Sequence, residues 1–163
     1  IIPLIPVYAA DVFEVGGEGF GVMMALFGLG GAAGTMVLVV GGDKSRKGPL
    51  MVTSGIIFGA CMIGFAFSRE YYLSLALLAV MGAVGLAYVI AISVLVQTYT
   101  PDEMRGRVMS LFGMTMQLFA LGFLLSGVLA EATSNELALV VGGIGVAIPP
   151  IFAFATSSEL RRA

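Results

Sequence analysis

The chain has 163 residues, of which 59% are hydrophobic and 11% are charged, and its formal net charge at pH 7 is −2. A soluble domain of this size carries about 25% charged residues and cannot hide so much apolar surface, so the composition excludes a soluble enzyme and a disordered chain. With no histidine, one cysteine and no surplus of basic residues, the sequence also excludes a His-based catalytic triad, a His or Cys metal site and a nucleic-acid partner, and it leaves a helical membrane protein.

Apolar stretches define the predicted elements in chain order. Residues 1–10 are too short to cross ~30 Å of hydrocarbon, and we expect them to be the end of a helix whose beginning is missing. Five longer stretches each exceed the roughly 20 residues that a membrane-spanning helix needs. They predict transmembrane helices over residues 19–42, 48–68, 71–99, 107–130 and 137–157. The predicted fold is therefore an all-α polytopic membrane protein with five complete transmembrane helices plus a partial one.

A β-barrel is the other structure that satisfies every backbone group in lipid. Its strands would alternate apolar and polar residues, whereas runs such as 75–81 are apolar almost throughout. The sequence therefore favours helices.

Local signals mark the ends of several helices. The segments 100–103 (TPDE) and 133–136 (TSNE) have the spacing of capping boxes, so each predicts the start of a helix. Tyr71 and Tyr99 bracket the third complete helix, as aromatic residues do at the two faces of a bilayer. The proline pair at 149–150 is expected to kink or end the last helix.

Basic residues are distributed unevenly between alternate loops. Residues 43–47, residues 102–107 and the C-terminus hold three, two and two Lys or Arg residues, whereas the other loops hold Arg69 alone. Because basic loops remain in the cytoplasm, we predict that these loops and the C-terminus are cytoplasmic and that the chain lies in the cell (inner) membrane.

Few polar groups lie at mid-depth in the predicted spans. No charged residue lies inside a span, so the chain offers no proton relay and no counter-ion for a charged substrate. Glycines are frequent, as in the pair Gly30 and Gly34, and they allow helix backbones to approach closely or to shift between two states. Tyr88 and Gln117 are the candidates for a substrate cavity, and packing between helices is the alternative role of both.

Two segments resemble bacterial permeases of the major facilitator superfamily. Residues 97–111 (QTYTPDEMRGRVMSL) are similar to the loop that joins the tenth and eleventh helices, and the similarity is closest to the enterobactin-exporter-like branch. Residues 21–34 (GVMMALFGLGGAAG) are similar to the eighth helix of that branch. The first of these strings contains Arg105, Gly106 and Arg107.

A third segment, residues 42–48 (GDKSRKG), resembles the second copy of the cytoplasmic signature of this superfamily, Gly-x-x-x-Asp-Arg-x-Gly-Arg-Arg/Lys. Asp43, Lys44 and Lys47 fit the signature. It departs from the pattern at three positions: Val39 replaces the leading glycine, Arg46 stands where glycine is expected and Gly48 where a basic residue is expected.

The resemblance covers nearly the whole chain and implies the C-terminal half of a secondary transporter, with residues 1–10 in the seventh helix and the complete spans as helices eight to twelve. It implies alternating access by two six-helix halves around a midplane site, which Tyr88 would face from the tenth helix. The implied cytoplasmic gating residues are Asp43, Lys44, Arg46, Lys47, Arg105, Gly106 and Arg107.

The expected function is export of a small organic molecule such as a drug or siderophore. The expected partners are that substrate, the lipid bilayer and a missing N-terminal half, and no cofactor or enzymatic activity is expected. A membrane scaffold or assembly domain that transports nothing is the alternative.

Overall fold

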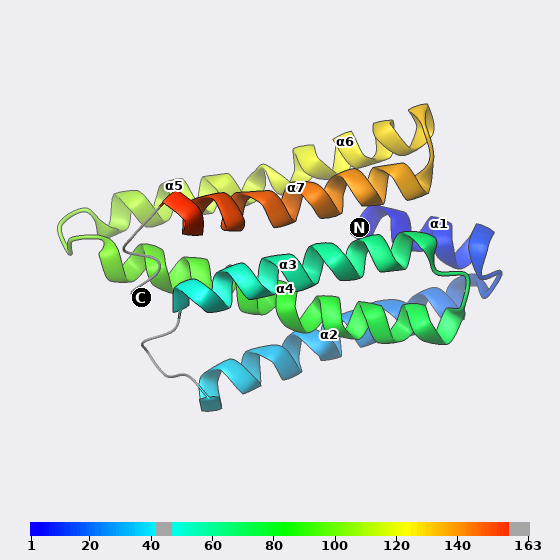
Figure 1. Cartoon of the computed structure of the whole chain (residues 1–163), viewed down its shortest axis with the longest axis horizontal. Helices are drawn as coiled ribbons and strands as arrows, with labels where there is room; N and C mark the ends of the chain where they lie inside the picture. Colours follow the sequence, from blue (N-terminus) through cyan, green and yellow to red (C-terminus); the bar gives the residue numbers. More distant parts are fainter. Residues whose placement is uncertain (42–46, 157–163) are drawn as a thin grey trace.

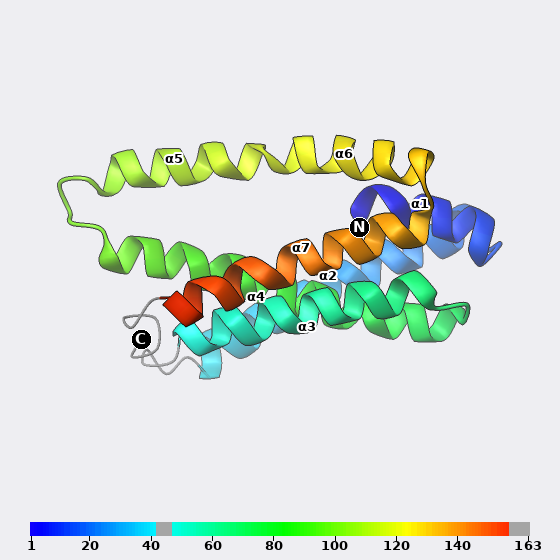
Figure 2. The ribbon, with the colours of Figure 1, turned by 45° about the horizontal axis from the view of Figure 1, so that its top comes forward.

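The structure, a computed structural model, describes residues 1–41 and 47–156, and the described residues contain helices and turns but no strand (Figure 1). Three short pieces, η1 (Ile2–Leu4), α1 (Ile5–Val7) and η2 (Tyr8–Val12), form an N-terminal helical segment. The longer helices are α2 (Gly16–Gly41), α3 (Lys47–Phe67), α4 (Tyr71–Tyr99), α5 (Arg105–Gln117), α6 (Phe119–Ala132) and α7 (Asn135–Thr156). Their axes lie roughly parallel or antiparallel to one another, so the connections between them lie at the two ends of the molecule (Figures 1 and 2).

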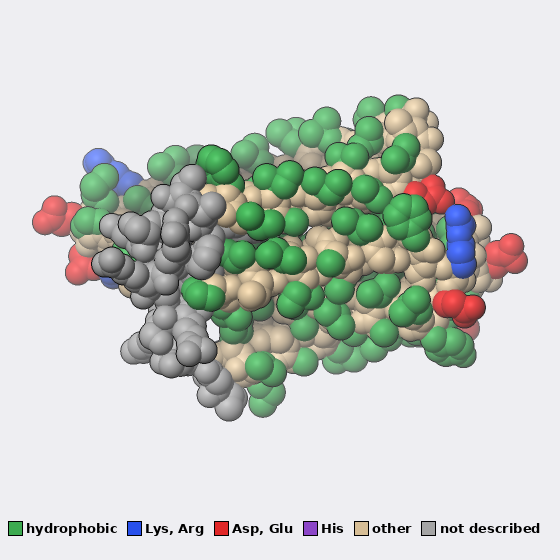
Figure 3. Space-filling view, in the orientation of Figure 1, with side chains coloured by type: hydrophobic (Ala, Val, Ile, Leu, Met, Phe, Trp, Pro, Cys, Tyr) green, Lys and Arg blue, Asp and Glu red, His purple; other side chains and the backbone are tan. Residues whose placement is uncertain are grey.

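We name these two ends by the turns they carry. The α3–α4 end holds the turn 68–70, the turn 133–134 and the start of α2. The α4–α5 end holds the connection 100–104, the end of α2 and the start of α3. In Figure 3, charged side chains lie at the two ends and hydrophobic side chains cover the length between them. This distribution is that of a protein whose sides contact hydrocarbon.

Four helical segments are long and apolar enough to cross a membrane. They are Gly16–Leu38, Pro49–Phe67, Tyr71–Tyr99 and Arg105–Ala132, and the last of these combines α5 and α6. Two further apolar helices, Ile2–Val12 and Asn135–Pro149, are shorter. The prediction of an all-α membrane fold is confirmed, whereas the count of five complete spans stays a prediction.

The start of α5 differs from the sequence prediction. Thr100 was expected to cap a helix beginning there, but its hydroxyl donates back to the carbonyl of Val96 at 2.5 Å and so closes α4. Helix α5 begins only at Arg105, after a turn, and Met104 at its N-cap position makes no side-chain cap bond. Threonine commonly bonds the carbonyl four residues back, and that bond competes with its use as a cap.

The last helix starts as expected but passes its prolines. The Ser134 hydroxyl accepts the N–H of Leu137 at 3.2 Å, which is the bond of an N-cap residue. Helix α7 continues through the pair at 149–150 to Thr156, so these prolines do not end it. Two prolines remove two backbone donors, a loss that membrane helices tolerate through local adjustment.

Glycines bring four helices into backbone contact. On α2, a Cβ added to Gly30 or Gly34 would collide with the backbone of Ala79 or Ala83 on α4. Between α3 and α7, a Cβ on Gly59 would lie 2.6 Å from the carbonyl oxygen of Gly143, and one on Gly143 would lie 2.9 Å from that of Gly59. Because α4 also packs on α3, we call α2, α3, α4 and α7 the four-helix body.

The largest buried cluster lies toward the α3–α4 end. Its members come from the N-terminal segment and from all helices of the four-helix body, and its largest fully buried side chains are Tyr8, Phe65, Ile5, Met23, Leu78, Met81 and Leu139. A smaller cluster of Met51, Ala91 and Leu95 joins the start of α3 to the last part of α4. The fold is therefore most tightly packed at one end.

Candidate functional site

Tyr88 lies half-buried at the contact between α4 and α3. Its ring packs against the small cluster of Met51, Ala91 and Leu95. In the described part of the chain its hydroxyl has no hydrogen-bond partner, and no buried side-chain oxygen or nitrogen of these residues lacks one. The hydroxyl of Tyr88 therefore reaches the surface of this chain while its ring serves as packing.

Gln117 is the last residue of α5 and is exposed. Its amide makes no hydrogen bond to any residue that the structure describes. An amide without a partner is costly in hydrocarbon, because the group loses its hydrogen bonds to water and gains none. A partner outside the described residues is therefore needed at this position when the helix lies in a membrane.

Tyr88 and Gln117 lie at the same depth. Tyr88 is 11 residues before Tyr99 and Gln117 is 12 residues after Arg105, where the two helices approach the shared α4–α5 end. At 1.5 Å per residue these separations correspond to roughly 17 and 18 Å, which is near the middle of a bilayer. No hydrogen bond joins the two side chains to each other in the described chain, so they share a level rather than a contact.

The proposed gating residues are only partly described. Asp43, Lys44 and Arg46 lie outside the described residues, and Lys47 begins α3 with a side chain that is not described. Gly106 faces open space, so its lack of a side chain is not required by any contact within the described chain.

Arg105 and Arg107 have different surroundings. The guanidinium of Arg105 pairs with the carboxylate of Asp102 at 2.6 Å, within the same turn. Both side chains are largely exposed, so the pair is weak and easily exchanged for another. Arg107 is exposed and has no ion-pair partner among the described residues, which leaves it available for an external contact.

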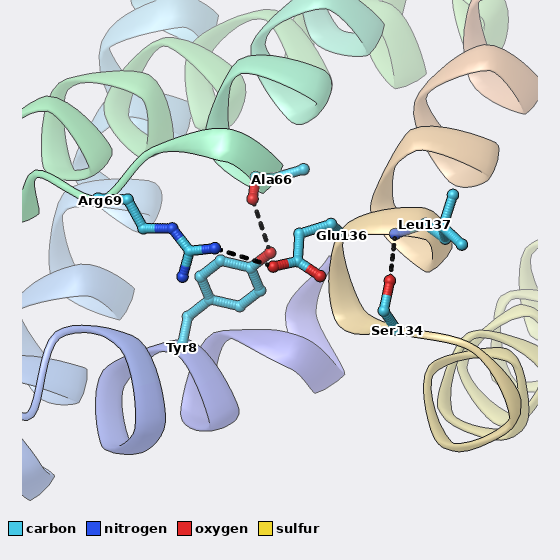
Figure 4. Close-up of polar contacts among 6 residues, drawn as sticks. All are labelled: Tyr8, Ala66, Arg69, Ser134, Glu136 and Leu137. Carbon is cyan, nitrogen blue, oxygen red and sulfur yellow. Dashed lines mark hydrogen bonds and ion pairs between the residues drawn. The ribbon is translucent and has the colours of Figure 1, made fainter.

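A polar network at the α3–α4 end was not predicted from the sequence. Arg69 pairs with Glu136 at 3.1 Å, and the buried Tyr8 hydroxyl donates to the carbonyl of Ala66 at 3.0 Å (Figure 4). Arg69 was counted only as the single basic residue of its set of loops. Its position as the only basic residue among acidic loops could have predicted an ion pair, because carboxylates lie within reach of such a residue.

Further bonds connect the helices near this network. The Tyr71 hydroxyl donates to the carbonyl of Gly19 at 3.1 Å and so ties α4 to α2. The buried Ser74 hydroxyl donates to Ser68 at 2.8 Å. The ring of Phe13 lies edge-on to that of Tyr71, with centroids 5.8 Å apart. The α3–α4 end is therefore held by buried polar and aromatic contacts together.

A shallow depression of about 450 Å³ lies along α6. It is lined by Phe123, Leu124, Gly127, Val128 and Glu131. Because one helix supplies all these residues, the depression is a surface feature of α6 and does not include Tyr88 or Gln117. The described residues also contain no group of three His, Cys, Asp or Glu side chains that could hold a metal ion.

Comparisons with known proteins identify the family of this chain. Comparisons with curated proteins and with solved structures found no match. The family model of the Major Facilitator Superfamily matches residues 1–161, which is nearly the whole chain. The apolar helices and the two charged ends are what a membrane transporter requires. The chain therefore belongs to the major facilitator superfamily of membrane transporters.

Proposed function

We propose that this chain is the C-terminal six-helix half of an exporter of small organic molecules that works by alternating access. The observation that carries the proposal is the pair of Tyr88 and Gln117 at one depth, without partners in the described chain. At mid-depth in a membrane no water reaches these groups, and a desolvated polar group without a partner costs about 1–3 kcal/mol, so each requires a hydrogen-bonding partner there. A substrate in a central site, or the facing half that encloses it, supplies such a partner.

The chemistry of this half favours a substrate that needs no counter-ion from it. Between the two charged ends, the described helices offer hydroxyl groups, the amide of Gln117, aromatic rings and apolar side chains. These groups bind by hydrogen bonds and apolar contact, which suits a drug-like molecule or a siderophore. The resemblance of residues 97–111 to the enterobactin-exporter-like branch supports the same substrate class.

We propose that the protein lies in the inner membrane of the cell and that its α4–α5 end faces the cytoplasm. The connection 100–104, the end of α2 and the last described residues of α7 lie at that end (Figure 2). These are the places next to which the sequence carries seven of its eight Lys and Arg residues. The C-terminus is then cytoplasmic as well.

The proposed gate lies at the same cytoplasmic end. Arg107 is free to pair with an acid of the facing half, and Arg105 can exchange Asp102 for such a partner at little cost. The residues of the signature-like segment, Asp43, Lys44, Arg46 and Lys47, together with Gly106, complete the proposed gate.

Transport assays on the full-length protein test this function. The protein is expressed in a strain without its own efflux pumps, and export of a panel of fluorescent drugs and iron-free siderophores is measured. The variants Tyr88→Phe and Gln117→Leu remove one polar group each, and Tyr99→Phe is the matched control at the end of α4. We expect a few-fold rise in the KM of the exported compound for the first two variants and none for the control, because one hydrogen bond contributes about 0.5–1.5 kcal/mol.

Two results would contradict the proposal. Unchanged KM in the double variant Tyr88→Phe/Gln117→Leu would remove both residues from the substrate site. Absence of transport for every compound, in a protein that is folded and inserted, would favour the non-transporting scaffold.

A further inference from the structure

We infer that Ser54 on α3 is a further specificity-determining residue, and that its hydroxyl and the hydroxyl of Tyr88 together bind one neutral oxygen group, a hydroxyl or a carbonyl, of the transported molecule. This role rests on the export function proposed above, and it extends the substrate site from α4 to α3. It follows from the burial of Ser54, from its lack of a hydrogen bond in the described chain and from its position opposite Tyr88.

Ser54 is a buried residue whose hydroxyl makes no hydrogen bond to any residue that the structure describes. Its relative exposure is 4%. Every other serine or threonine with a described side chain takes part in a hydrogen bond. The neighbouring Thr53, for example, donates to the carbonyl of Pro49 at 3.0 Å, the usual arrangement of a hydroxyl inside a helix. A desolvated hydroxyl without a partner is costly, so Ser54 requires a partner other than its own helix.

The oxygen of Ser54 is not completely enclosed by protein. Among the described residues, no fully enclosed side-chain oxygen or nitrogen lacks a hydrogen-bond partner. The Ser54 oxygen has no partner there, so it keeps a small accessible surface although its residue is buried. The Tyr88 hydroxyl is also unbonded in this part of the chain and reaches the surface. Both hydroxyls are therefore open to a ligand.

Two contacts between α3 and α4 fix how these helices are aligned. Met51 of α3 shares a buried cluster with Ala91 of α4. Seven residues further along α3, the ring of Phe58 lies against Gly85, where an added Cβ would be 2.9 Å from the Phe58 Cε2 atom. The two helices are therefore antiparallel, with residues 51–58 of α3 against residues 85–91 of α4.

Ser54 and Tyr88 lie between these two contacts. Ser54 comes three residues after the first α3 contact and four residues before the second, a spacing that keeps all three residues on one face of the helix. Tyr88 comes three residues from each of the two α4 contacts and lies on the face between them. The two residues therefore lie opposite each other where α3 packs on α4.

The chemistry of two hydroxyls defines the group that they can bind. Each hydroxyl donates one hydrogen bond and accepts others, so the pair can hold a hydroxyl that both donates and accepts, or a carbonyl oxygen that accepts from both. The described helices carry no charged side chain at the depth of Tyr88. A carboxylate or an ammonium would lack a counter-charge there, so the bound group is neutral.

Thiol accessibility in the full-length protein tests whether a ligand can reach Ser54. In a Cys61→Ala background, Ser54→Cys is compared with Ile56→Cys, a position that is 42% exposed and lies 200° around α3 from Ser54, toward hydrocarbon. The probe is 2-aminoethyl methanethiosulfonate, a small water-soluble reagent that requires an ionised thiol. We expect Ser54→Cys to react about tenfold faster than Ile56→Cys, because a substrate site opens to water and hydrocarbon does not ionise a thiol. Equal rates would overturn the inference.

Transport measurements test recognition by the hydroxyl. Export of tetracycline, Nile red and iron-free enterobactin is measured for Ser54→Ala and for the matched control Thr53→Val, which removes the adjacent, bonded hydroxyl. We expect the KM of an exported compound to rise about two- to tenfold in Ser54→Ala only, as for one lost hydrogen bond, while kcat and the unfolding temperature without substrate stay unchanged.

The outcomes separate this role from the export function beneath it. Export with an unchanged KM in Ser54→Ala would overturn the role of Ser54 alone, and its hydroxyl would then bind only water. A lower unfolding temperature with an unchanged KM would assign the hydroxyl to helix packing. Absence of export for all three compounds in the wild-type protein would instead count against the proposed function.

Discussion

Single polar side chains divide into those that bond within the chain and those that point elsewhere. The hydroxyl of Tyr8, a residue that is 2% exposed, donates a hydrogen bond to the carbonyl of Ala66, and Arg69 forms an ion pair with Glu136. Tyr88 and Gln117 have no such partner in the described chain. Tyr8 and Arg69 lie at the α3–α4 end and Tyr88 and Gln117 lie at mid-depth, so these bonded and unbonded groups occupy different levels of the molecule.

Removal of the Tyr8 hydroxyl should destabilise the protein. Tyr8→Phe leaves the Ala66 carbonyl without its donor at the end of α3, at a cost of about 1 kcal/mol. Tyr99→Phe, at an exposed tyrosine, is the control. We expect thermal unfolding of the full-length protein in detergent to begin at a lower temperature for Tyr8→Phe only. Equal unfolding temperatures would mean that the hydroxyl contributes nothing.

The pair of Arg69 and Glu136 should behave as an exposed ion pair. Its arginine side chain is 70% exposed, so we expect Arg69→Glu to cost no more than about 1 kcal/mol of stability. The exchanged pair Arg69→Glu/Glu136→Arg should recover most of the loss, and high salt should reduce the difference. A double variant less stable than both single variants would show that other contacts of these residues dominate.

At the scale of helices, the lengths of the apolar runs predicted the helix ends better than the capping-box motifs did. Helix α4 begins at Tyr71 and ends at Tyr99, as the tyrosines indicated, because a long apolar run admits few other ends. The cap at Thr100 failed because its hydroxyl bonds its own helix, and the break at Leu118 had no sequence signal, since glutamine, leucine and threonine all occur inside helices. Such details depend on competing hydrogen bonds that a one-dimensional pattern does not contain.

Glycine substitutions should have opposite effects on stability in a helix packed by its glycines, such as α2, and in an exposed helix, such as α5. Gly34→Ala places a methyl group against the backbone of Ala83 and should lower the unfolding temperature by several degrees. Gly113→Ala, on α5, meets open space and should leave stability unchanged or raise it, since alanine favours helix by about 0.5–1 kcal/mol over glycine. The measurement is thermal unfolding of both variants under one condition. A loss of stability for Gly113→Ala as large as for Gly34→Ala would show that α5 is packed against a partner in the full-length protein.

At the scale of the whole molecule, the sequence predicted the class of fold well but did not predict the polar contacts at the α3–α4 end. Apolar runs gave an all-α membrane protein, and the resemblance of residues 21–34, 42–48 and 97–111 gave the family whose model matches residues 1–161. Tyr88 and Gln117 were singled out because polar residues are rare at mid-depth, and their place in a substrate site stays a prediction. The network of Arg69, Glu136 and Tyr8 was missed, because its members are far apart in the chain and meet only through the packing of the helices.

Side-specific labelling tests the orientation of the whole molecule. In a Cys61→Ala background, Thr133→Cys and Glu103→Cys place single thiols at exposed positions of the two opposite ends. We expect a membrane-impermeant maleimide to label Thr133→Cys in intact cells and Glu103→Cys only after the membrane is opened, because the basic loops stay inside. Labelling of both positions in intact cells would overturn the proposed topology.

The contact between Arg69 and Glu136 also bears on how the protein is made. The two residues are 67 positions apart, so at about 5–20 residues per second the ribosome adds Glu136 roughly 3–13 s after Arg69. During that interval the arginine lacks its carboxylate, and Gly59 on α3 lacks the backbone of α7. Arrival of α7 completes both contacts in one step. A nascent chain that stops before α7 therefore presents an unpaired cation and an open helix face, two features that membrane quality control can recognise.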